Sequence, residues 1–488
     1  MAWRPLALLS GGLAVFLLIF STRYGPHRDE LYFRTAGQHL AWGYVDQPAF
    51  TPLVARLVTE LFGNALVGWR LPSALAAGAT VLVTGLIARR LGADRPAQLL
   101  AGAAMAVAAV LLILGHLLST ATFDLLFWTL ISFLVVRQLQ GADPRGWLLV
   151  GLVVGIALHN KTLVAVLVAA LLIGLLAVGP RLVLRSGWLW AGAGLAALVW
   201  LPNLVWQAQH GWPQLTLARA IAGGSSGSSQ PWWLFLPMQL VLVSPVLVAM
   251  WVPGLIRLWR AAELRPVRSF AVAYVLLAAV FLVTGGKPYY LAGLYPVLLA
   301  AGAPLVVGWL RRRRDARGWI AGGLGLSLLV NAVLMLPVLP ARALAVTPIV
   351  DINYDAGETV GWPTFVATVA EVYAALPPAE RASAGVVTRN YGQAGAIDRY
   401  GPELGLPEAH SGHNAYFDWG PPADTGGPVV LVGFDEVFLR TVFGEVSRAA
   451  TVDNGLGVDN EEQGTPVWVG RELRGTWAEL WPTFRRLG

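Results

Sequence analysis

The 488-residue sequence contains no cysteine, and this absence excludes disulfide bonds and thiol chemistry. Charged residues are also scarce: they make up 13% of the chain, whereas a soluble protein carries about a quarter. Hydrophobic residues make up 56% of the chain, and several apolar stretches run without interruption. The composition therefore predicts a protein that crosses a lipid bilayer many times.

Lysine is almost absent, because only two of the 35 basic residues are lysines. The net charge of +7 could suggest nucleic acid as a partner, but its distribution argues against that interpretation. Residues 1–340 contain 25 of the basic residues and only 9 of the 28 acidic residues, so the remainder of the chain is net acidic. A basic excess confined to the hydrophobic part orients membrane helices, so no nucleic-acid partner is expected.

Eleven segments are apolar enough and long enough to cross a bilayer, which takes roughly 20 residues. The first of them has no small-residue cleavage site after it, so we interpret it as a transmembrane helix and not as a signal peptide. The expected spans are 5–22, 68–88, 97–115, 122–139, 146–159, 162–179, 187–205, 233–256, 269–284, 290–310 and 318–338.

Arginine clusters lie at every second junction between these spans. If the N-terminus is cytoplasmic, all the clusters fall in short cytoplasmic loops, as the positive-inside rule requires. We therefore expect a multi-pass protein of the bacterial plasma membrane with a cytoplasmic N-terminus. The clusters are Arg89, Arg90 and Arg95; Arg137 and Arg145; Arg181 and Arg185; Arg257, Arg260, Arg265 and Arg268; and Arg311, Arg312, Arg313, Arg314 and Arg317.

This topology places three longer segments outside. In 23–67, the stretches 30–42 and 51–62 have helical apolar spacing and are expected to lie along the membrane surface. The segment 206–232 ends in the run 223–230, whose composition is typical of a flexible chain.

The third outer segment is the tail from residue 341 onward. A helical pattern occurs around 364–375, and β-rich runs occur at 385–388, 428–432 and 466–469. The expected fold class is mainly α: a bundle of about eleven spans with amphipathic helices at its outer face, plus a small extracytoplasmic α/β domain. The expected domains are a transmembrane domain, 1–340, with its first loop at 23–67, and the tail domain, 341–488.

Few carboxylates lie near the expected outer face. Asp29 and Glu30 follow the first span, where a carboxylate would also suit the start of a helix. Asp46 precedes Gln47-Pro48 and has the alternative interpretation of a turn residue. Asp124 opens an apolar span, where an ionisable group is costly unless it lines a polar cavity.

The two lysines, Lys161 and Lys287, both fall at expected outer-face junctions. A lysine at a helix end can simply extend its ammonium group to the interface. This sequence, however, uses arginine for every other positive charge, which suggests that a compact cation is needed at these two positions, for example to bind a phosphate.

Outer-face carboxylates, phosphate-suited cations and the aromatic pair Tyr289 and Tyr290 fit the transfer of a sugar from a polyprenyl phosphate. One carboxylate would deprotonate an acceptor hydroxyl, which then attacks the anomeric carbon. The cations would stabilise the charge growing on the departing phosphate. Such a direct displacement inverts the anomeric centre.

The stretch Arg28-Asp29-Glu30-Leu-Tyr, with Gly43-Tyr-Val-Asp46-Gln-Pro after it, resembles the first extracytoplasmic loop of the dolichyl-phosphate-mannose–protein mannosyltransferase family. That family includes bacterial aminoarabinose transferases of lipid A, which are C-type glycosyltransferases. The resemblance extends to Thr-Phe-Asp124, His-Asn-Lys161-Thr and Lys287-Pro-Tyr-Tyr followed by Tyr-Pro.

The resemblance implies Asp29 as the catalytic base, with Glu30 assisting it or binding the acceptor. It also implies two groups of ligand-binding residues. Expected to bind the donor phosphate are Lys161, Lys287 and Arg28. Expected to bind substrate are Asp46, Asp124, Tyr289, Tyr290, His27 and His116.

The tail contains two further stretches that resemble those of actinobacterial members. They are Tyr391-Gly-Gln-Ala-Gly-Ala-Ile-Asp-Arg-Tyr and Ser411-Gly-His-Asn-Ala-Tyr-Phe-Asp-Trp-Gly. The tail domain would cover the site or hold an acceptor, or these stretches would be turns and core of a small fold. The acceptor is expected to be a hydroxyl of a glycan, a lipid or a protein. The tail has no extended carbohydrate-binding module and no second membrane bundle, which argues against protein.

Other functions fit some of the same residues. Membrane carboxylates and lysines also mark the substrate pathways of a transporter or lipid flippase. A non-catalytic protein that only binds a lipid-linked sugar is another alternative. No metal-ligating residues are assigned, although a divalent cation such as Mg²⁺, Mn²⁺ or Ca²⁺ is a possible cofactor if Asp29, Glu30, Asp46 and Asp124 converge.

Overall fold

The computed structural model describes residues 1–223 and 231–488, so nearly all of the expected flexible run 223–230 lies outside the described residues. The chain forms two compact units. The first, named the helical unit, comprises 1–21, 47–51 and 70–336. The second, named the sheet unit, comprises 22–46, 52–69 and 337–488.

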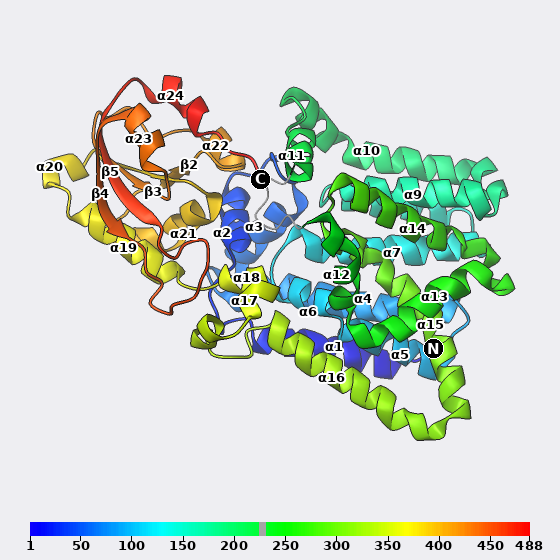
Figure 1. Ribbon diagram of the computed structural model, residues 1–488. Coiled ribbons are helices and arrows are strands. Elements are labelled where there is room, and N and C mark those ends of the chain that lie inside the picture. Colours follow the sequence, from blue (N-terminus) through cyan, green and yellow to red (C-terminus); the bar gives the residue numbers. More distant parts are fainter. Residues whose placement is uncertain (224–230) are drawn as a thin grey trace. The chain divides into compact units, whose positions relative to one another are not determined.

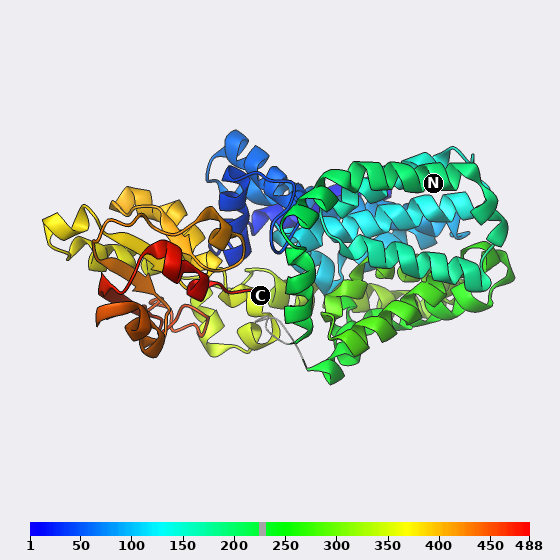
Figure 2. The same ribbon diagram turned by 90° about the horizontal axis from the view of Figure 1, so that it is seen from above.

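The helical unit consists of apolar α-helices that run side by side (Figures 1 and 2). Its helices are α1 (Trp3–Ile19), α4 (Leu66–Arg90), α5 (Arg95–Ala106), α6 (Ala109–His116), α7 (Thr120–Leu139), α8 (Gly146–Leu158), α9 (Leu163–Val178), α10 (Gly187–Gln209), α11 (Pro213–Ala222), α12 (Phe235–Val243), α13 (Val248–Arg260), α14 (Ser269–Thr284), α15 (Tyr295–Arg312) and α16 (Arg317–Met335). The short 3-10 helix η5 (Pro288–Leu294) leads into α15.

Each of the eleven spans expected from the sequence coincides with an apolar helix or a bent helix pair. Among the described residues, five helices are long and apolar enough to cross a membrane, and two bent pairs raise the number to seven. The pairs bend by 61° between α5 and α6 and by 90° between α12 and α13. The other four expected spans correspond to the shorter apolar helices α1, α8, α9 and α14. The chain is a multi-pass membrane protein.

Glycines allow these helices to approach one another closely. A Cβ added at Gly151 of α8 would lie 2.0 Å from the carbonyl oxygen of Gly192 in α10. A Cβ at Gly302 of α15 would lie 1.9 Å from the carbonyl oxygen of Met250 in α13. Small residues at such contacts are a common way of packing helices in a membrane, where water drives no association between them.

The sheet unit contains a five-stranded sheet in the order β2-β1-β3-β5-β4. β1 pairs in parallel with β2 and β3, whereas β5 is antiparallel to β3 and β4. The three expected β-runs are confirmed as β1, β3 and β5, and the edge strands β2 and β4 were not predicted. The strands are β1 (Gly385–Thr388), β2 (Ala409–Ser411), β3 (Val429–Val432), β4 (Phe443–Thr451) and β5 (Pro466–Leu473).

Helices pack around this sheet, and an aromatic core of Phe443, Trp468, Trp477, Trp481 and Phe484 holds its C-terminal part together. The helix expected around 364–375 is α19. The helices of the sheet unit are α2 (Arg28–Gln38), α3 (Phe50–Phe62), α17 (Ile349–Ile352), α18 (Tyr354–Gly357), α19 (Trp362–Ala374), α20 (Pro378–Arg381), α21 (Tyr391–Tyr400), α22 (Ala415–Trp419), α23 (Glu436–Val442) and α24 (Trp477–Phe484).

Most of the first loop packs with the tail. The expected boundary at 340/341 lies near the observed break after residue 336, but 22–46 and 52–69 are grouped with 337–488. Helix α2, expected to lie along a membrane surface, instead buries Leu31, Tyr32 and Ala36 within the sheet unit. The acidic pair of the first loop is therefore surrounded by residues of the tail.

Candidate functional site

Helix α2 begins with a capping box, in which two side chains bind backbone N–H groups of the first turn. Nδ1 of His27 accepts a hydrogen bond from the Asp29 backbone N–H at 3.2 Å. Oε2 of Glu30 accepts one from the His27 backbone N–H at 2.8 Å. Glu30 is only 1% exposed. This buried carboxylate therefore stabilises the start of the helix, and its expected role beside a catalytic base stays a prediction.

Asp29 differs from Glu30 because its side chain is 36% exposed. Its Oδ1 accepts a hydrogen bond from the Tyr391 hydroxyl at 2.8 Å. Its Oδ2 lies 4.0 Å from Nδ1 of His27. The Asp29 carboxylate is thus oriented by a tyrosine of α21 and still accessible.

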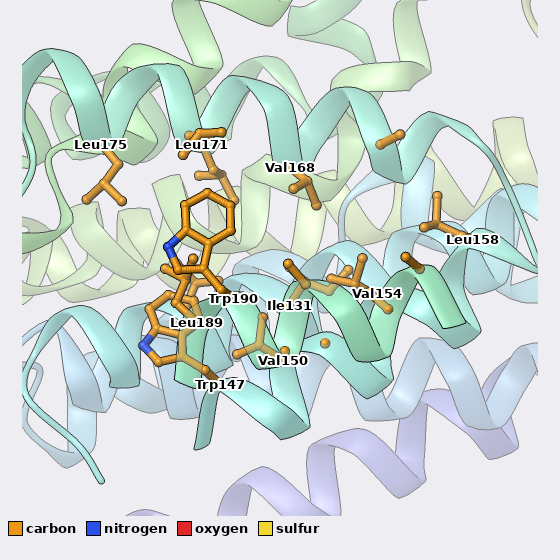
Figure 3. A pocket seen from close by; sticks show the side chains of 18 of the residues that line it. Ile131, Trp147, Val150, Val154, Leu158, Val168, Leu171, Leu175, Leu189 and Trp190 are labelled. Carbon is orange, nitrogen blue, oxygen red and sulfur yellow. The ribbon is translucent and has the colours of Figure 1, made fainter. Parts of the chain in front are cut away.

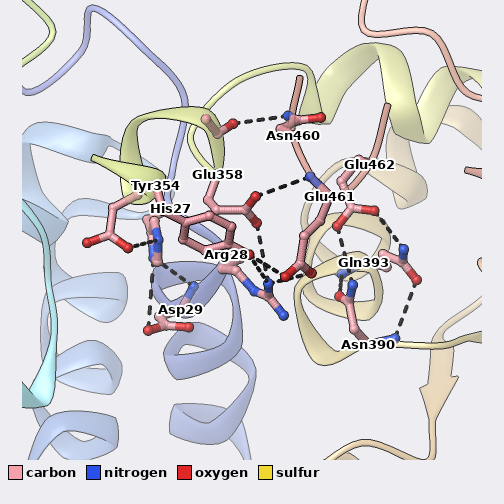
Figure 4. Close-up of polar contacts among 12 residues, drawn as sticks. His27, Arg28, Asp29, Tyr354, Glu358, Asn390, Gln393, Asn460, Glu461 and Glu462 are labelled. Atoms are coloured by element: carbon pink, nitrogen blue, oxygen red, sulfur yellow. Dashed lines mark hydrogen bonds and ion pairs between the residues drawn. The ribbon is translucent and has the colours of Figure 1, made fainter. Parts of the chain in front are cut away.

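Arg28 is buried within a network of acidic residues from the tail (Figure 4). Its Nη1 lies 2.6 Å from Oε2 of Glu461 and 3.4 Å from Oε2 of Glu358. The same nitrogen donates to the Tyr354 hydroxyl at 3.1 Å. Two carboxylates already neutralise the guanidinium, so the structure favours Arg28 as the link between α2 and the tail over the expected contact with a lipid phosphate.

The acidic surroundings favour the protonated form of His27, whereas the cap hydrogen bond to Nδ1 requires the neutral form. Burial acts to lower the pKa of His27, but a hydrogen bond with Asp355 and the charges of Asp29, Asp355 and Glu358 raise it to about 9. Nε2 of His27 lies 3.5 Å from Oδ1 of Asp355. His27 thus begins the helix beside the acidic pair, and its expected contact with substrate stays a prediction.

Asp46 is held by a second tyrosine of the sheet unit. The Tyr32 hydroxyl donates to Oδ1 of Asp46 at 2.7 Å. Burial raises the pKa of Asp46 to about 7, with a smaller contribution from the charge of Asp29, although the Tyr32 hydrogen bond acts to lower it. The rings of Tyr32 and Tyr391 are 4.7 Å apart and inclined by 32°. Two packed tyrosines therefore bind two carboxylates, named the tyrosine–carboxylate array (Asp29, Tyr391, Tyr32 and Asp46).

Two glycines of the tail stretch Tyr391-Gly-Gln-Ala-Gly explain how α21 comes so close to α2. A Cβ at Gly392 would lie 2.8 Å from Cβ of Arg28, and one at Gly395 would lie 2.9 Å from the carbonyl carbon of Leu31. The second tail stretch also faces α2, because the Tyr416 hydroxyl donates to Oγ1 of Thr35 at 3.0 Å. Both stretches singled out in the sequence therefore pack against the first loop.

The helical unit brings together a second set of expected site residues. The ammonium of Lys161 lies 5.2 Å from the ring centre of Tyr289 and 4.9 Å from that of Tyr290. Asp124 interacts electrostatically with Lys161. Lys287 belongs to the same segment through the sequence, because it directly precedes η5, which contains Tyr289 and Tyr290. This group is named the lysine–tyrosine cluster (Asp124, Lys161, Lys287, Tyr289 and Tyr290).

Asn160 holds the surroundings of Lys161 in place. Its side-chain N–H donates to the Thr120 carbonyl at 2.8 Å, one turn before Asp124. Its Oδ1 accepts a hydrogen bond from Oγ1 of Thr51 at 2.9 Å. Asn160 is fully buried. In the sequence, Asn160 stands out only as a neighbour of Lys161. Its role in joining the Thr120 carbonyl and the Thr51 hydroxyl was not predicted.

Gln47 is a further residue that was not singled out. Both polar atoms of its side chain are buried and have no hydrogen-bond partner among the described residues. Oδ1 of Asp124 is likewise buried without a partner within the described ranges. Because an unsatisfied buried polar group is costly, such groups in a native structure often indicate a place where a ligand or water binds.

His116, expected to bind substrate, lies inside the helical unit. Its Nε2 is 3.2 Å from Nη1 of Arg70, which also donates to the Ser21 carbonyl at 2.6 Å. This contact links α6, α4 and the segment after α1, while Nδ1 of His116 is buried without a hydrogen-bond partner among the described residues. The expected role of His116 stays a prediction.

Among the described residues, one group of three carboxylates is close enough to hold a metal ion: Glu358, Glu461 and Glu462. None of the four carboxylates that the sequence suggested for a cation belongs to it. Arg28 contacts Glu358 and Glu461, and Gln393 donates to Glu462 at 2.6 Å. Protein donors therefore already satisfy this group.

A cavity of about 360 Å³ lies between α7, α8, α9 and α10 (Figure 3). Apart from Ser269 and the indole nitrogens, its lining is apolar and includes Val150, Val168 and Leu171. Among the described residues, its lining includes no carboxylate or cation, so these residues offer neither a general base nor a charge for a departing phosphate.

The meeting of Asp29 and Glu30 with the two lysines in one cavity stays a prediction, because these residues belong to different units. The tyrosines and glutamates of the tail that bind α2 were not predicted as site residues. Tyr391 lies 362 residues from Asp29, so no local spacing could reveal the contact. The available signal was the stretch that begins at Tyr391.

Comparisons with known proteins show what the chain is similar to. Residues 46–206 match the dolichyl-phosphate-mannose-protein mannosyltransferase family. An undecaprenyl phosphate-alpha-4-amino-4-deoxy-L-arabinose arabinosyl transferase of Pseudomonas fluorescens is 29% identical over 317 residues, which is 60% of this chain and 54% of that protein. One from Pseudomonas aeruginosa PAO1 is 29% identical over 321 residues, covering 60% of this chain and 55% of that protein. The chain thus spans a little over half of the length of these curated relatives.

Solved structures show the same fold. ArnT from Cupriavidus metallidurans bound to undecaprenyl phosphate has a TM-score of 0.60 at 15% identity, covering 95% of this chain and 97% of that chain. The archaeal oligosaccharyltransferase AglB from Archaeoglobus fulgidus has a TM-score of 0.50 at 13% identity, covering 81% of this chain and 63% of that chain. The expected resemblance is therefore confirmed: this chain is similar to the dolichyl-phosphate-mannose-protein mannosyltransferase family over residues 46–206, and to bacterial aminoarabinose transferases over about 60% of its length.

Proposed function

We propose that this protein is an inverting glycosyltransferase that moves a sugar from a polyprenyl-phosphate donor to a hydroxyl acceptor at the extracytoplasmic face of the membrane. The family match and the curated aminoarabinose transferases support the donor class. The arginine clusters at alternate junctions support a cytoplasmic N-terminus and an extracytoplasmic tail.

Asp29 is the proposed general base. The observation that carries this assignment is the contrast within the acidic pair: Glu30 is buried in the helix cap, whereas Asp29 is 36% exposed and oriented by Tyr391. The proton of the acceptor hydroxyl passes to Asp29 while the acceptor oxygen forms a bond with the anomeric carbon. The bond between that carbon and the phosphate oxygen breaks, and its electron pair leaves with the polyprenyl phosphate.

The lysine–tyrosine cluster is the proposed contact for the donor phosphate. Lys161 and Lys287 are compact cations. Lys161 faces the rings of Tyr289 and Tyr290, and Lys287 directly precedes the segment that contains them. Placed at the leaving group, they stabilise the charge that develops on the phosphate. A divalent cation stays a possible cofactor, and transfer that persists in chelator excludes a requirement for it.

Two variants of the acidic pair test the base. Asp29→Asn removes the base and is expected to lower transfer about 100-fold or more in membranes supplied with polyprenyl-phosphate sugars. Glu30→Gln is the matched control, because a glutamine oxygen can still accept the His27 N–H. We expect the control to retain transfer within about 10-fold, whereas full activity of Asp29→Asn would exclude Asp29 as the base.

The same assay separates the enzyme from its alternatives. A transporter or a non-catalytic binder would bind the donor but form no glycosylated product, even in the wild-type protein. For the enzyme, Asp29→Asn should retain donor binding, measured with the radiolabelled lipid, while product formation is lost. Mass spectrometry of the envelope glycans of a deletion strain would identify the missing sugar and its acceptor together.

A further inference from the structure

The tail contributes a side chain to the acidic site of the first loop. Tyr391 stands at the first position of α21, within the capping box formed by Asn390 and Gln393. Its hydroxyl donates to Oδ1 of Asp29 at 2.8 Å. Tyr391 is therefore fixed at the rigid start of a helix and aimed at the exposed carboxylate.

The ring of Tyr391 is held on two sides within the sheet unit. It lies 4.7 Å from the ring of Tyr32 and 4.7 Å from that of His413. Arg28 lies 5.0 Å from its centre. Packing on several sides leaves the hydroxyl little freedom, so it can restrict the rotation of the Asp29 side chain.

The hydroxyl remains a donor throughout the working pH range. Burial raises the pKa of Tyr391 well above its ordinary value, and the nearby charge of Asp29 raises it further. A protonated hydroxyl bound to Oδ1 occupies one carboxylate oxygen and leaves the other to meet an acceptor.

We infer that Tyr391 is a positioning residue that holds the Asp29 carboxylate in its productive orientation, so that the tail completes the catalytic site. This inference rests on the proposed role of Asp29 as the base. It gives the first tail stretch a function: the glycines of α21 permit close contact with α2, and the tyrosine before them orients the reacting group.

The test compares two tyrosines that differ in their carboxylate partner. Tyr391→Phe keeps the packed ring and removes only the hydroxyl that donates to Asp29. Tyr416→Phe is the matched control, because Tyr416 also lies near Tyr32, at 6.2 Å between rings, but donates to Asp398 and Thr35. We expect Tyr391→Phe to lower kcat about 10-fold to 100-fold with the KM for donor changed less than about 2-fold, because misorientation of a reacting group affects the rate of the chemical step.

A double variant distinguishes failure of this inference from failure of the proposed function. In the Asp29→Asn background, adding Tyr391→Phe should cause no further loss, because Tyr391 acts through Asp29. If Asp29→Asn inactivates the enzyme but Tyr391→Phe alone leaves kcat unchanged, the inference is overturned and the base assignment survives. If Asp29→Asn retains full transfer, the base assignment itself fails. Equal losses in Tyr391→Phe and Tyr416→Phe, with equal drops in thermal stability, would assign both hydroxyls a structural role and also overturn the inference.

Discussion

At the scale of a single residue, the burial of the Asp46 carboxylate makes the stability of the folded protein depend on pH. Its pKa of about 7 lies above the ordinary value of 3.8, chiefly because of burial. A group whose pKa is higher in the folded state contributes stability that is present below the ordinary pKa and is lost as the pH rises through the folded value. The stability due to Asp46 therefore falls between about pH 4 and pH 7.

Asp46→Asn should make the purified protein more stable at neutral pH. Asparagine keeps an oxygen for the Tyr32 hydroxyl and carries no charge. We expect the free energy of unfolding of the variant to exceed that of the wild type by a margin that grows by about 1 to 2 kcal/mol between pH 5 and pH 8. This range is smaller than the full pKa shift of Asp46 would give, because solvent reaches part of its side chain. Thermal unfolding in detergent at both pH values measures the difference, and a constant difference would contradict the prediction.

The residue scale is also where the sequence was least informative. The site expected around Asp29 stays a prediction, and the contacts found there were not foreseen: Glu30 caps helix α2, and Arg28 is bound by carboxylates of the tail. These partners lie more than 300 positions away, and only the folded chain reveals them. Lys161 and Tyr289 were singled out separately, and the structure brings them together.

At the scale of elements, the packing of α21 on α2 depends on the space at Gly395. Gly395→Ala would place a Cβ 2.9 Å from the Leu31 carbonyl carbon, so the two helices must separate. We expect a loss of about 1 to 3 kcal/mol of stability and faster amide hydrogen exchange in α2. The control is Gly194→Ala, in a helix position with nothing within 4 Å, which should be neutral or slightly stabilising. Equal exchange in α2 of both variants would contradict the prediction.

The elements that the sequence predicted correctly share a simple pattern. The central strands β1, β3 and β5 contain apolar runs that are largely buried, and they were recognised as β-rich. Strands β2 and β4 stand at the two edges of the sheet. β4 is mostly exposed and includes the polar residues Glu445, Ser447 and Arg448, and β2 has only three residues, so neither produces an apolar run. Edge strands are often short or polar, which limits their recognition from sequence.

At the scale of the whole molecule, the absence of cysteine makes the proposed topology directly measurable. A single cysteine at Glu403, exposed in the sheet unit, should react with a membrane-impermeant maleimide in intact cells. A single cysteine at Asp143, exposed between α7 and α8, should react only after the membrane is permeabilised. Labelling of both positions in intact cells, or the reverse pattern, would contradict a cytoplasmic N-terminus and an extracytoplasmic tail.

The positions of the apolar helices followed from the hydrophobic runs in the sequence, because a bilayer requires a long apolar stretch in every helix that crosses it. Among the described residues, five of these helices, or seven with the two bent pairs, are long and apolar enough to cross. The grouping of the first loop with the tail did not follow from the sequence. Residues 22–46 and 337–488 form one unit through contacts such as Gly25 N–H to the Thr359 carbonyl at 2.8 Å. Such pairing depends on surfaces whose complementarity no hydrophobic pattern reveals.

This division of one unit between two distant stretches has a consequence for biosynthesis. At about 5 to 20 residues per second, a ribosome needs roughly 15 to 60 s to extend the chain from residue 46 to residue 337. During that interval α2 has already been made, but Arg28 lacks Glu358 and Glu461, and Leu31 has no helix to cover it. A chain whose translation stops early therefore presents an uncovered apolar surface to quality-control proteases, and the acidic site takes shape only after the last third of the polypeptide has been made.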